Sequence, residues 1–165
     1  MKYPYLPEGY TIEYVGGDNP FMQQAKEVAR TSNERHMPTG AVAVYNNEII
    51  SQACNHAPIS SDTLIHLHKK YCFRRILKIK SGKSYWLCPG CASPHSHAEA
   101  RTVAGLSEKG IRDFDLYLWG HYWACKDCWD AMIKAGVKQV FLLEGSEVFF
   151  NKENPNNSIG KQFEI

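Results

Sequence analysis

The sequence predicts an α/β fold in which helices flank a mixed β-sheet. Two observations lead to this prediction. The apolar runs at residues 40–45 and 48–54 have the length and composition of strands, and only a pair of asparagines separates them, as in a hairpin. Further along, strand, helix and strand patterns follow one another at 115–119, 125–135 and 137–143, which is typical of layered α/β proteins.

The first helix is predicted to begin at Asp18-Asn19-Pro20, because a capping side chain followed by proline is a helix-start signal. Apolar residues then recur at helical spacing, and Met37-Pro38 is expected to end the helix. In the hairpin, Asn46-Asn47 suits a tight turn, since asparagine tolerates a positive φ.

Two more helices are expected. One spans residues 96–109, and the other spans 125–135 and ends at Gly136, which suits a helix C-terminus. Residues from about 57 to 95 do not fit the alternation of strands and helices. We interpret them as an insertion in a single domain that spans residues 1–165. The polar tail from Asn151 is predicted to be loosely packed.

The composition is that of a globular protein. Of the residues, 44% are hydrophobic and the net charge is only +2. No apolar run approaches the ~20 residues that cross a bilayer, and the N-terminus lacks the apolar core of a secretory signal. We therefore expect a cytoplasmic protein that does not engage membranes. In that setting, cysteines in C-x-x-C pairs favour metal binding over disulfides.

Three potential zinc ligands and a carboxylate form the most informative motif. His97 and Glu99 occur as His-Ala-Glu, and Cys125 and Cys128 follow as C-K-D-C. Both groups fall at predicted helix starts, where backbone N–H groups favour thiolates. Zinc with three protein ligands keeps a position for water, and can lower the pKa of that water from about 15.7 to about 7. Glu99 is then the expected proton shuttle.

Together these residues resemble the zinc-dependent cytidine/deoxycytidylate deaminase superfamily, whose signature is H-x-E followed by P-C-x-x-C. The resemblance covers roughly residues 20–145, and it is strongest in 38–58, 97–103 and 125–145. The long insertion before His-Ala-Glu makes the chain most similar to deoxycytidylate (dCMP) deaminases. The resemblance implies a cytidine deaminase-like sheet with a zinc-binding insertion.

The resemblance also implies a mechanism and a pocket. Zinc-activated water would attack C4 of a cytosine ring while Glu99 moves the protons. Asn55 matches the asparagine that contacts the sugar in this family, and Thr39, Gly40 and Ala41 would line the base pocket. The family's proline before the first cysteine is Ala124 here, which leaves the pocket shape and the substrate choice open.

A second, structural zinc is predicted in the insertion. Cys88 and Cys91 form a C-P-G-C knuckle, and structural zinc is normally closed by four Cys or His side chains. We expect Cys72, Cys88, Cys91 and His95 as ligands, with His68 as a substitute. Two alternatives remain: buried thiols with surface histidines, or one zinc ribbon shared by the two C-x-x-C pairs.

The insertion is also basic. Residues 69–83 carry seven Lys or Arg and no acidic residue, so the rest of the chain is −5 against the total of +2. A solvated helix face, a nucleotide phosphate and a nucleic-acid backbone are the three interpretations.

We predict hydrolytic deamination of a cytosine nucleotide, of the dCMP to dUMP type. The alternatives are a deaminase that acts on another base or on nucleic acid, as in tRNA adenosine deamination, and a non-catalytic zinc protein that binds nucleic acid. The expected partner is a small-molecule nucleotide, with nucleic acid less favoured. The resemblance also implies a homo-oligomer.

Overall fold

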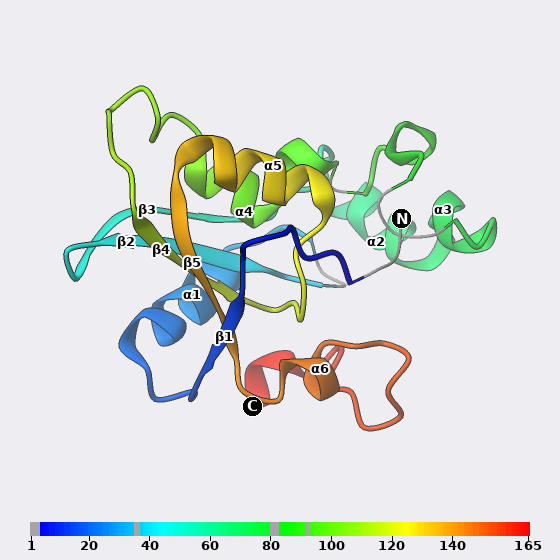
Figure 1. Cartoon of the computed structure of the whole chain (residues 1–165). Coiled ribbons are helices and arrows are strands. Elements are labelled where there is room, and N and C mark those ends of the chain that lie inside the picture. The colour runs from blue at the N-terminus through cyan, green and yellow to red at the C-terminus, as the bar shows by residue number, and fades with distance from the viewer. Residues whose placement is uncertain (1–3, 35–36, 80–82, 92) are drawn as a thin grey trace.

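A mixed β-sheet forms the middle layer of the molecule (Figure 1). Its strand order is β1-β5-β4-β2-β3. β1 (Ile12–Val15) and β4 (Phe114–Trp119) run parallel to β5 (Val137–Leu143), and β2 (Gly40–Tyr45) runs antiparallel to β4 and to β3 (Glu48–Cys54). This mixed sheet with flanking helices confirms the predicted fold class. The computed structural model describes residues 4–34, 37–79, 83–91 and 93–165.

Helix α1 (Pro20–Arg30) covers one face of the sheet (Figure 1). The side chain of Asn19 caps it, because Oδ1 accepts hydrogen bonds from the backbone N–H groups of Phe21 and Met22 at 3.0 and 3.1 Å. The predicted start is therefore confirmed. The predicted end at Met37 is wrong, since the helix stops at Arg30.

Helices α4 (Ala98–Val103) and α5 (Lys126–Ala135) cover the other face (Figure 1). Side chains of β2 alternate between the two layers: Ala41 and Ala43 face α4 and α5, whereas Val42 and Val44 face α1. α5 ends at Gly136 as predicted, where the backbone takes a φ of 94° that favours glycine. α4 is much shorter than the predicted helix over 96–109.

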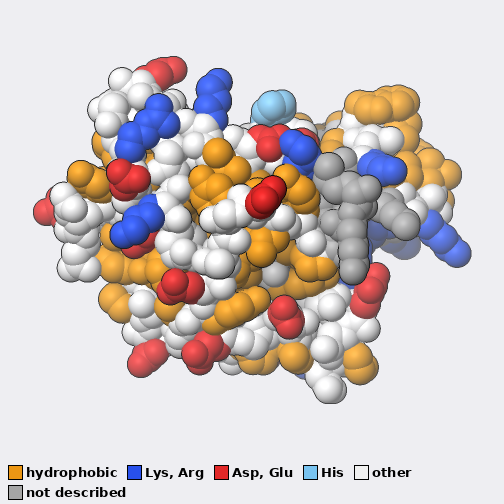
Figure 2. Space-filling model, in the orientation of Figure 1, with side chains coloured by type: hydrophobic (Ala, Val, Ile, Leu, Met, Phe, Trp, Pro, Cys, Tyr) orange, Lys and Arg blue, Asp and Glu red, His pale blue; other side chains and the backbone are white. Residues whose placement is uncertain are grey.

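The insertion lies beside the end of the sheet and adds no strand in its described residues (Figure 1). It contains α2 (Asp62–Tyr71), α3 (Phe73–Ile76) and the 3-10 helices η1 (Tyr85–Leu87) and η2 (Pro94–Ser96). Figure 2 shows hydrophobic and basic side chains gathered over α2 and α3. Several large apolar residues are exposed, with Trp86 at 81% and Phe73 at 61%. Such a segment has little apolar core to hold its shape.

None of the helices in the described ranges has both the length and the apolar character that crossing a bilayer requires.

The end of the C-terminal tail packs against the core, so the prediction of loose packing is wrong for Gln162 and Phe163, whereas residues 151–161 are exposed or half-buried. After α6 (Ser146–Phe149), Phe150 is buried against Trp119, and the ring of Phe163 stacks on Trp119 with the ring centroids 4.9 Å apart. Phe163 precedes the chain end in the 3-10 helix η3 (Gln162–Glu164). Phe163 is the single aromatic residue of this polar tail, and it supplies the contact with the core.

We expect Phe163→Ala to lower the free energy of unfolding by about 1–3 kcal/mol, because it removes apolar burial and an aromatic pair. The guanidinium of Arg30, at 4.6 Å from the centroid of the Phe163 ring, would lose this ring contact as well. Urea unfolding measures the change. Phe73→Ala is the matched control, since Phe73 is 61% exposed and its loss should change little. Equal midpoints for the two variants would contradict a packed tail.

Candidate active site and metal centres

The structure brings His97, Cys125 and Cys128 together. His97 precedes the first turn of α4, and the two cysteines begin α5. Nδ1 of His97 lies 3.6 Å from Sγ of Cys125 and 3.4 Å from Sγ of Cys128. Zinc bonds of about 2.1 Å to nitrogen and 2.3 Å to sulfur at tetrahedral angles put these atoms about 3.6 Å apart. The three side chains therefore fit one zinc ion, with Nδ1 as the imidazole ligand.

The two thiols of this cluster differ in acidity. A hydrogen bond from Cys128, helped by His97, lowers the pKa of Cys125 to about 5. The same hydrogen bond and burial raise the pKa of Cys128. At neutral pH the pair therefore holds at least one thiolate, which is the form that binds a cation.

Glu99 lies beside this cluster and is only 5% exposed. Burial raises the pKa of its carboxyl, although the neighbouring His97 opposes the shift. A carboxyl in such a place holds a proton more readily than an exposed one. It can therefore take a proton from a neighbouring group and give it back, which is what a shuttle requires.

A second cluster lies in the insertion and consists of His68, Cys72, Cys88 and Cys91. Sγ of Cys72 lies 3.9 Å from that of Cys88 and 3.5 Å from that of Cys91, and Nε2 of His68 lies 3.5 Å from Cys91. Tetrahedral zinc–sulfur bonds of about 2.3 Å predict sulfur separations of about 3.8 Å. Four ligands at these distances fit a closed structural site.

This cluster corrects one prediction. His95 is exposed and does not belong to the group, whereas His68 does. Helix α2 places the His68 side chain against the knuckle of Cys88 and Cys91. The contact is close, because a Cβ at Gly90 would lie 2.3 Å from the His68 ring. The shared zinc ribbon is also wrong, since Cys88 and Cys91 belong to one cluster and Cys125 and Cys128 to the other.

The ionisation of the second cluster resembles that of the first. Burial opposes ionisation of Cys72, but hydrogen bonds from Arg75, Cys91 and His68 outweigh it and lower the pKa to about 6. Burial and the neighbouring Cys72 raise the pKa of Cys91 to about 12. One thiolate is thus available near neutral pH here too.

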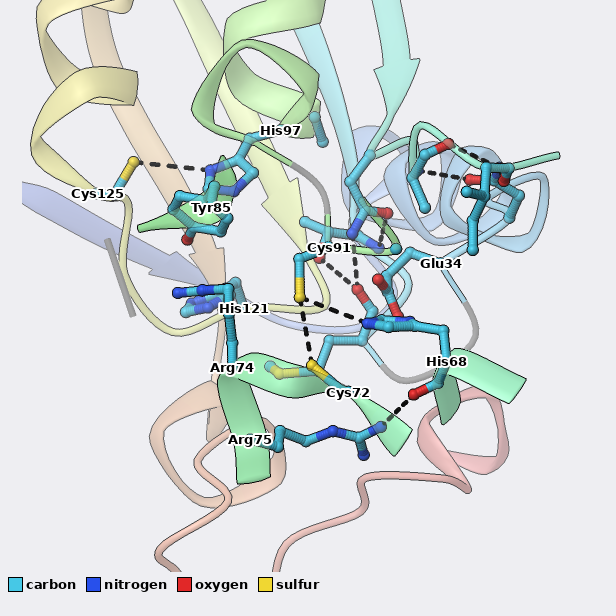
Figure 3. A pocket seen from close by; sticks show the side chains of 18 of the residues that line it. Glu34, His68, Cys72, Arg74, Arg75, Tyr85, Cys91, His97, His121 and Cys125 are labelled. Carbon is cyan, nitrogen blue, oxygen red and sulfur yellow. Dashed lines mark hydrogen bonds between the residues drawn. The ribbon is translucent and has the colours of Figure 1, made fainter. Parts of the chain in front are cut away.

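Both clusters border one cavity (Figure 3). His97, Glu99 and Cys125 line it from the α4 and α5 side, and His68, Cys72 and Cys91 line it from the insertion. Charged side chains also line the cavity: the cationic Arg74, Arg75 and Lys152, and the acidic Glu34.

Comparison with known proteins identifies the family. The zinc-binding region of cytidine and deoxycytidylate deaminases matches residues 17–144, which is more than half of the chain. The chain belongs to this family.

Solved structures similar to this deaminase have low sequence identity. The dCMP deaminase of cyanophage S-TIM5, in apo form, is 21% identical over 74% of this chain and 78% of the phage protein, with a TM-score of 0.46. Guanine deaminase of Bacillus subtilis is 19% identical over 74% of this chain and 60% of its own, with a TM-score of 0.41.

A third structure, the diaminohydroxyphosphoribosylaminopyrimidine deaminase/5-amino-6-(5-phosphoribosylamino)uracil reductase of Thermotoga maritima, is 20% identical over 74% of this chain, with a TM-score of 0.41. This deaminase spans only 28% of that protein. No individually curated protein sequence is significantly similar to the chain.

Of the residues expected to bind substrate in this deaminase, Asn55 and Thr39 line the cavity. Asn55 Oδ1 accepts hydrogen bonds from Thr39 N at 2.9 Å and Ser32 Oγ at 2.6 Å, and its Nδ2 donates to Met37 O at 2.9 Å. The side chain of Asn55 therefore fixes the backbone of the cavity wall at Thr39 and Met37. In the described part of the chain Nδ2 donates no other hydrogen bond, so its second hydrogen is available to an acceptor in the cavity.

Gly40 and Ala41 do not line the cavity, so this expectation is wrong. Ala41 is completely buried in the core below the cavity. At Gly40, a Cβ would lie 2.1 Å from the carbonyl oxygen of Ala25 in α1, and only glycine allows this approach. The alternation of strand β2 explains both placements.

The loop that carries Ala124 contributes His121 to the cavity wall of the deaminase. Nδ1 of His121 accepts from the backbone N–H groups of Tyr122 and Trp123 at 3.1 and 3.3 Å. Burial lowers the pKa of His121 to about 3, so the imidazole is neutral near pH 7. Trp123 lines the same wall.

Sequence reasoning missed His121 and Lys152, as well as the place of Arg74 and Tyr85 in the cavity. His121 lay in an aromatic run and Lys152 in a tail thought to be loose. Arg74 was one of seven basic residues, and Tyr85 had only aromatic character to mark it. Only the fold brings the insertion, the loop between β4 and α5 and the tail to one cavity.

Proposed function

We propose that this chain catalyses the hydrolytic deamination of a cytosine nucleotide, converting dCMP to dUMP. The observation that carries the proposal is the convergence of His97 Nδ1 with two thiols beside the buried carboxyl of Glu99. Family membership supplies the reaction class. Arg75 and Lys152 on the cavity wall favour a substrate that carries a phosphate over a free nucleoside.

In this proposal His97, Cys125 and Cys128 hold zinc, which when bound supplies a water activated for attack on C4. Glu99 accepts the proton of that water and delivers a proton to N3 of the ring. Glu99 then transfers the remaining proton of the hydroxyl on C4 to the exocyclic amine, which leaves as ammonia. Thr39 and Asn55 form the wall beside the base and sugar.

We also propose a second, structural zinc held by His68, Cys72, Cys88 and Cys91, so that each chain carries two ions. Four ligands leave no place for a water, which limits this ion to a structural role. Residues 1–165 would then form one deaminase domain, with residues of about 57–95 as a metal-stabilised insertion.

Ammonia release from dCMP, deoxycytidine, cytidine, guanine and a tRNA tests the substrate. We expect turnover of dCMP with a kcat/KM at least about 10-fold above that for deoxycytidine, because a charge-assisted phosphate contact is worth roughly 1.5–3 kcal/mol. Both product and ammonia should form in equal amounts. Turnover of tRNA or guanine alone, or equal kcat/KM for nucleotide and nucleoside, would overturn the substrate.

A further inference from the structure

Two side chains connect the metal clusters across the cavity. Figure 3 shows Tyr85 beside His97, and Arg74 near Tyr85 on the side of the cavity where Cys72 and Cys91 lie. The ring of Tyr85 meets the His97 imidazole edge to face, with centroids 5.8 Å apart at an angle of 79°. A residue of the insertion therefore contacts the group of His97, Cys125 and Cys128, which we call the catalytic cluster.

Arg74 fixes this contact. It is only 8% exposed, and its guanidinium lies 3.9 Å from the centroid of the Tyr85 ring. Its Nε donates to the carbonyl oxygen of Lys83 at 3.0 Å, and its side chain also hydrogen-bonds to Cys91. Arg74 thus packs over one face of the Tyr85 ring.

Both residues are tied to ligands of the second cluster. Arg74 follows Cys72 by two positions. The 3-10 helix of Tyr85 runs directly into the knuckle, where the backbone N–H of Cys88 donates to the carbonyl oxygen of Tyr85 at 3.1 Å. Because the insertion has little apolar core, the position of Tyr85 depends on the four-ligand cluster more than on packing.

We propose that Tyr85 is a positioning residue for His97, and that the second cluster controls the catalytic cluster through it. The proposal rests on the proposed zinc function of His97. Metal at His68, Cys72, Cys88 and Cys91 fixes Arg74 and Tyr85, and Tyr85 holds the imidazole so that Nδ1 faces the two thiols. Residues that orient a metal-binding histidine typically change metal affinity or activity about 10–100-fold when they are replaced.

Release of zinc to a chromogenic chelator tests this without substrate. The two ions of the fully loaded protein should leave in two phases. Cys125→Ser keeps all four insertion ligands but breaks the catalytic set, so the phase that remains in this variant belongs to the insertion. We expect Tyr85→Ala to speed release from the catalytic cluster about 10–100-fold, and Tyr85→Phe, which keeps the ring, to behave like the parent. Trp86→Ala is the control, since this neighbour is 81% exposed.

Control by the second cluster is tested with Cys88→Ser. It should speed release from the catalytic cluster by the same factor as Tyr85→Ala, and the double variant should show no further increase. The visible bands of the cobalt-substituted catalytic cluster should shift in both single variants, and circular dichroism reports whether they are folded. If Tyr85→Ala is folded and releases its catalytic ion like the parent, the positioning role is wrong. If Cys88→Ser affects one ion only, the control between clusters is wrong.

These results do not depend on the substrate. Altered release in a protein that turns over no dCMP would leave the positioning role standing and overturn the proposed function. Turnover of dCMP with unaltered release would do the reverse.

Discussion

Glu99→Gln should reduce deamination by about 10²–10⁴-fold, the range typical of a lost general acid–base group, while zinc binding persists. Glutamine has the same size and can still hydrogen-bond, but it cannot take up the proton of the attacking water. Because Glu99 is buried, solvent cannot easily replace it as a proton acceptor. Initial rates with dCMP and zinc content measured on the same preparation check both parts.

Glu108→Gln is the matched control, because Glu108 is exposed and follows α4 by a few residues. It should retain the parent's rate. A Glu99→Gln protein with normal zinc and normal turnover would remove Glu99 from the mechanism, whichever substrate is used. Loss of zinc in the same variant would instead make Glu99 part of the metal site.

Gly40→Ala should lower the free energy of unfolding by about 3 kcal/mol, at the upper end of the range for overpacked cores. The added Cβ would lie 2.1 Å from the carbonyl oxygen of Ala25 and 2.6 Å from the amide nitrogen of Ala29. Both neighbours are backbone atoms of α1, so no side chain can rotate away and the helix must move off the sheet. For a chain of this size the melting temperature should fall by roughly 6–12 °C.

Gly17→Ala provides the comparison. There the new Cβ would meet only Leu143 Cδ1 at 3.8 Å, an ordinary contact, and the melting temperature should stay close to the parent's. If Gly40→Ala and Gly17→Ala have the same melting temperature, α1 does not pack as closely on β2 as the distances indicate.

The central sheet could be predicted because its signals are local. The apolar runs of β2, β3 and β5 and the glycine after α5 each mark an element within a few residues. Strand β1 was missed, because Ile12–Val15 has only four residues and half of them are exposed. Its place beside β5 follows from pairing with a strand more than a hundred residues away.

The cluster of His97, Cys125 and Cys128 could be predicted because its ligands lie in two short motifs, each at the start of a helix. The second cluster was predictable only as a composition of cysteines and histidines. His95 lies closer in sequence to the knuckle than His68, but α2 and the close approach at Gly90 bring His68 there instead. Choosing between two histidines needs the path of the chain, which no spacing rule supplies.

The way α4 and α5 begin has a thermodynamic consequence. Unlike Asn19 of α1, the N-cap residues His97 and Cys125 make no capping hydrogen bond with their side chains, and α4 is only six residues long. A helix this short does not persist alone. If the proposed zinc ion binds His97 and Cys125, it links the starts of the two helices, and metal uptake is then coupled to the folding of these turns. We therefore expect a chelator to unfold α4 locally as well as to stop turnover.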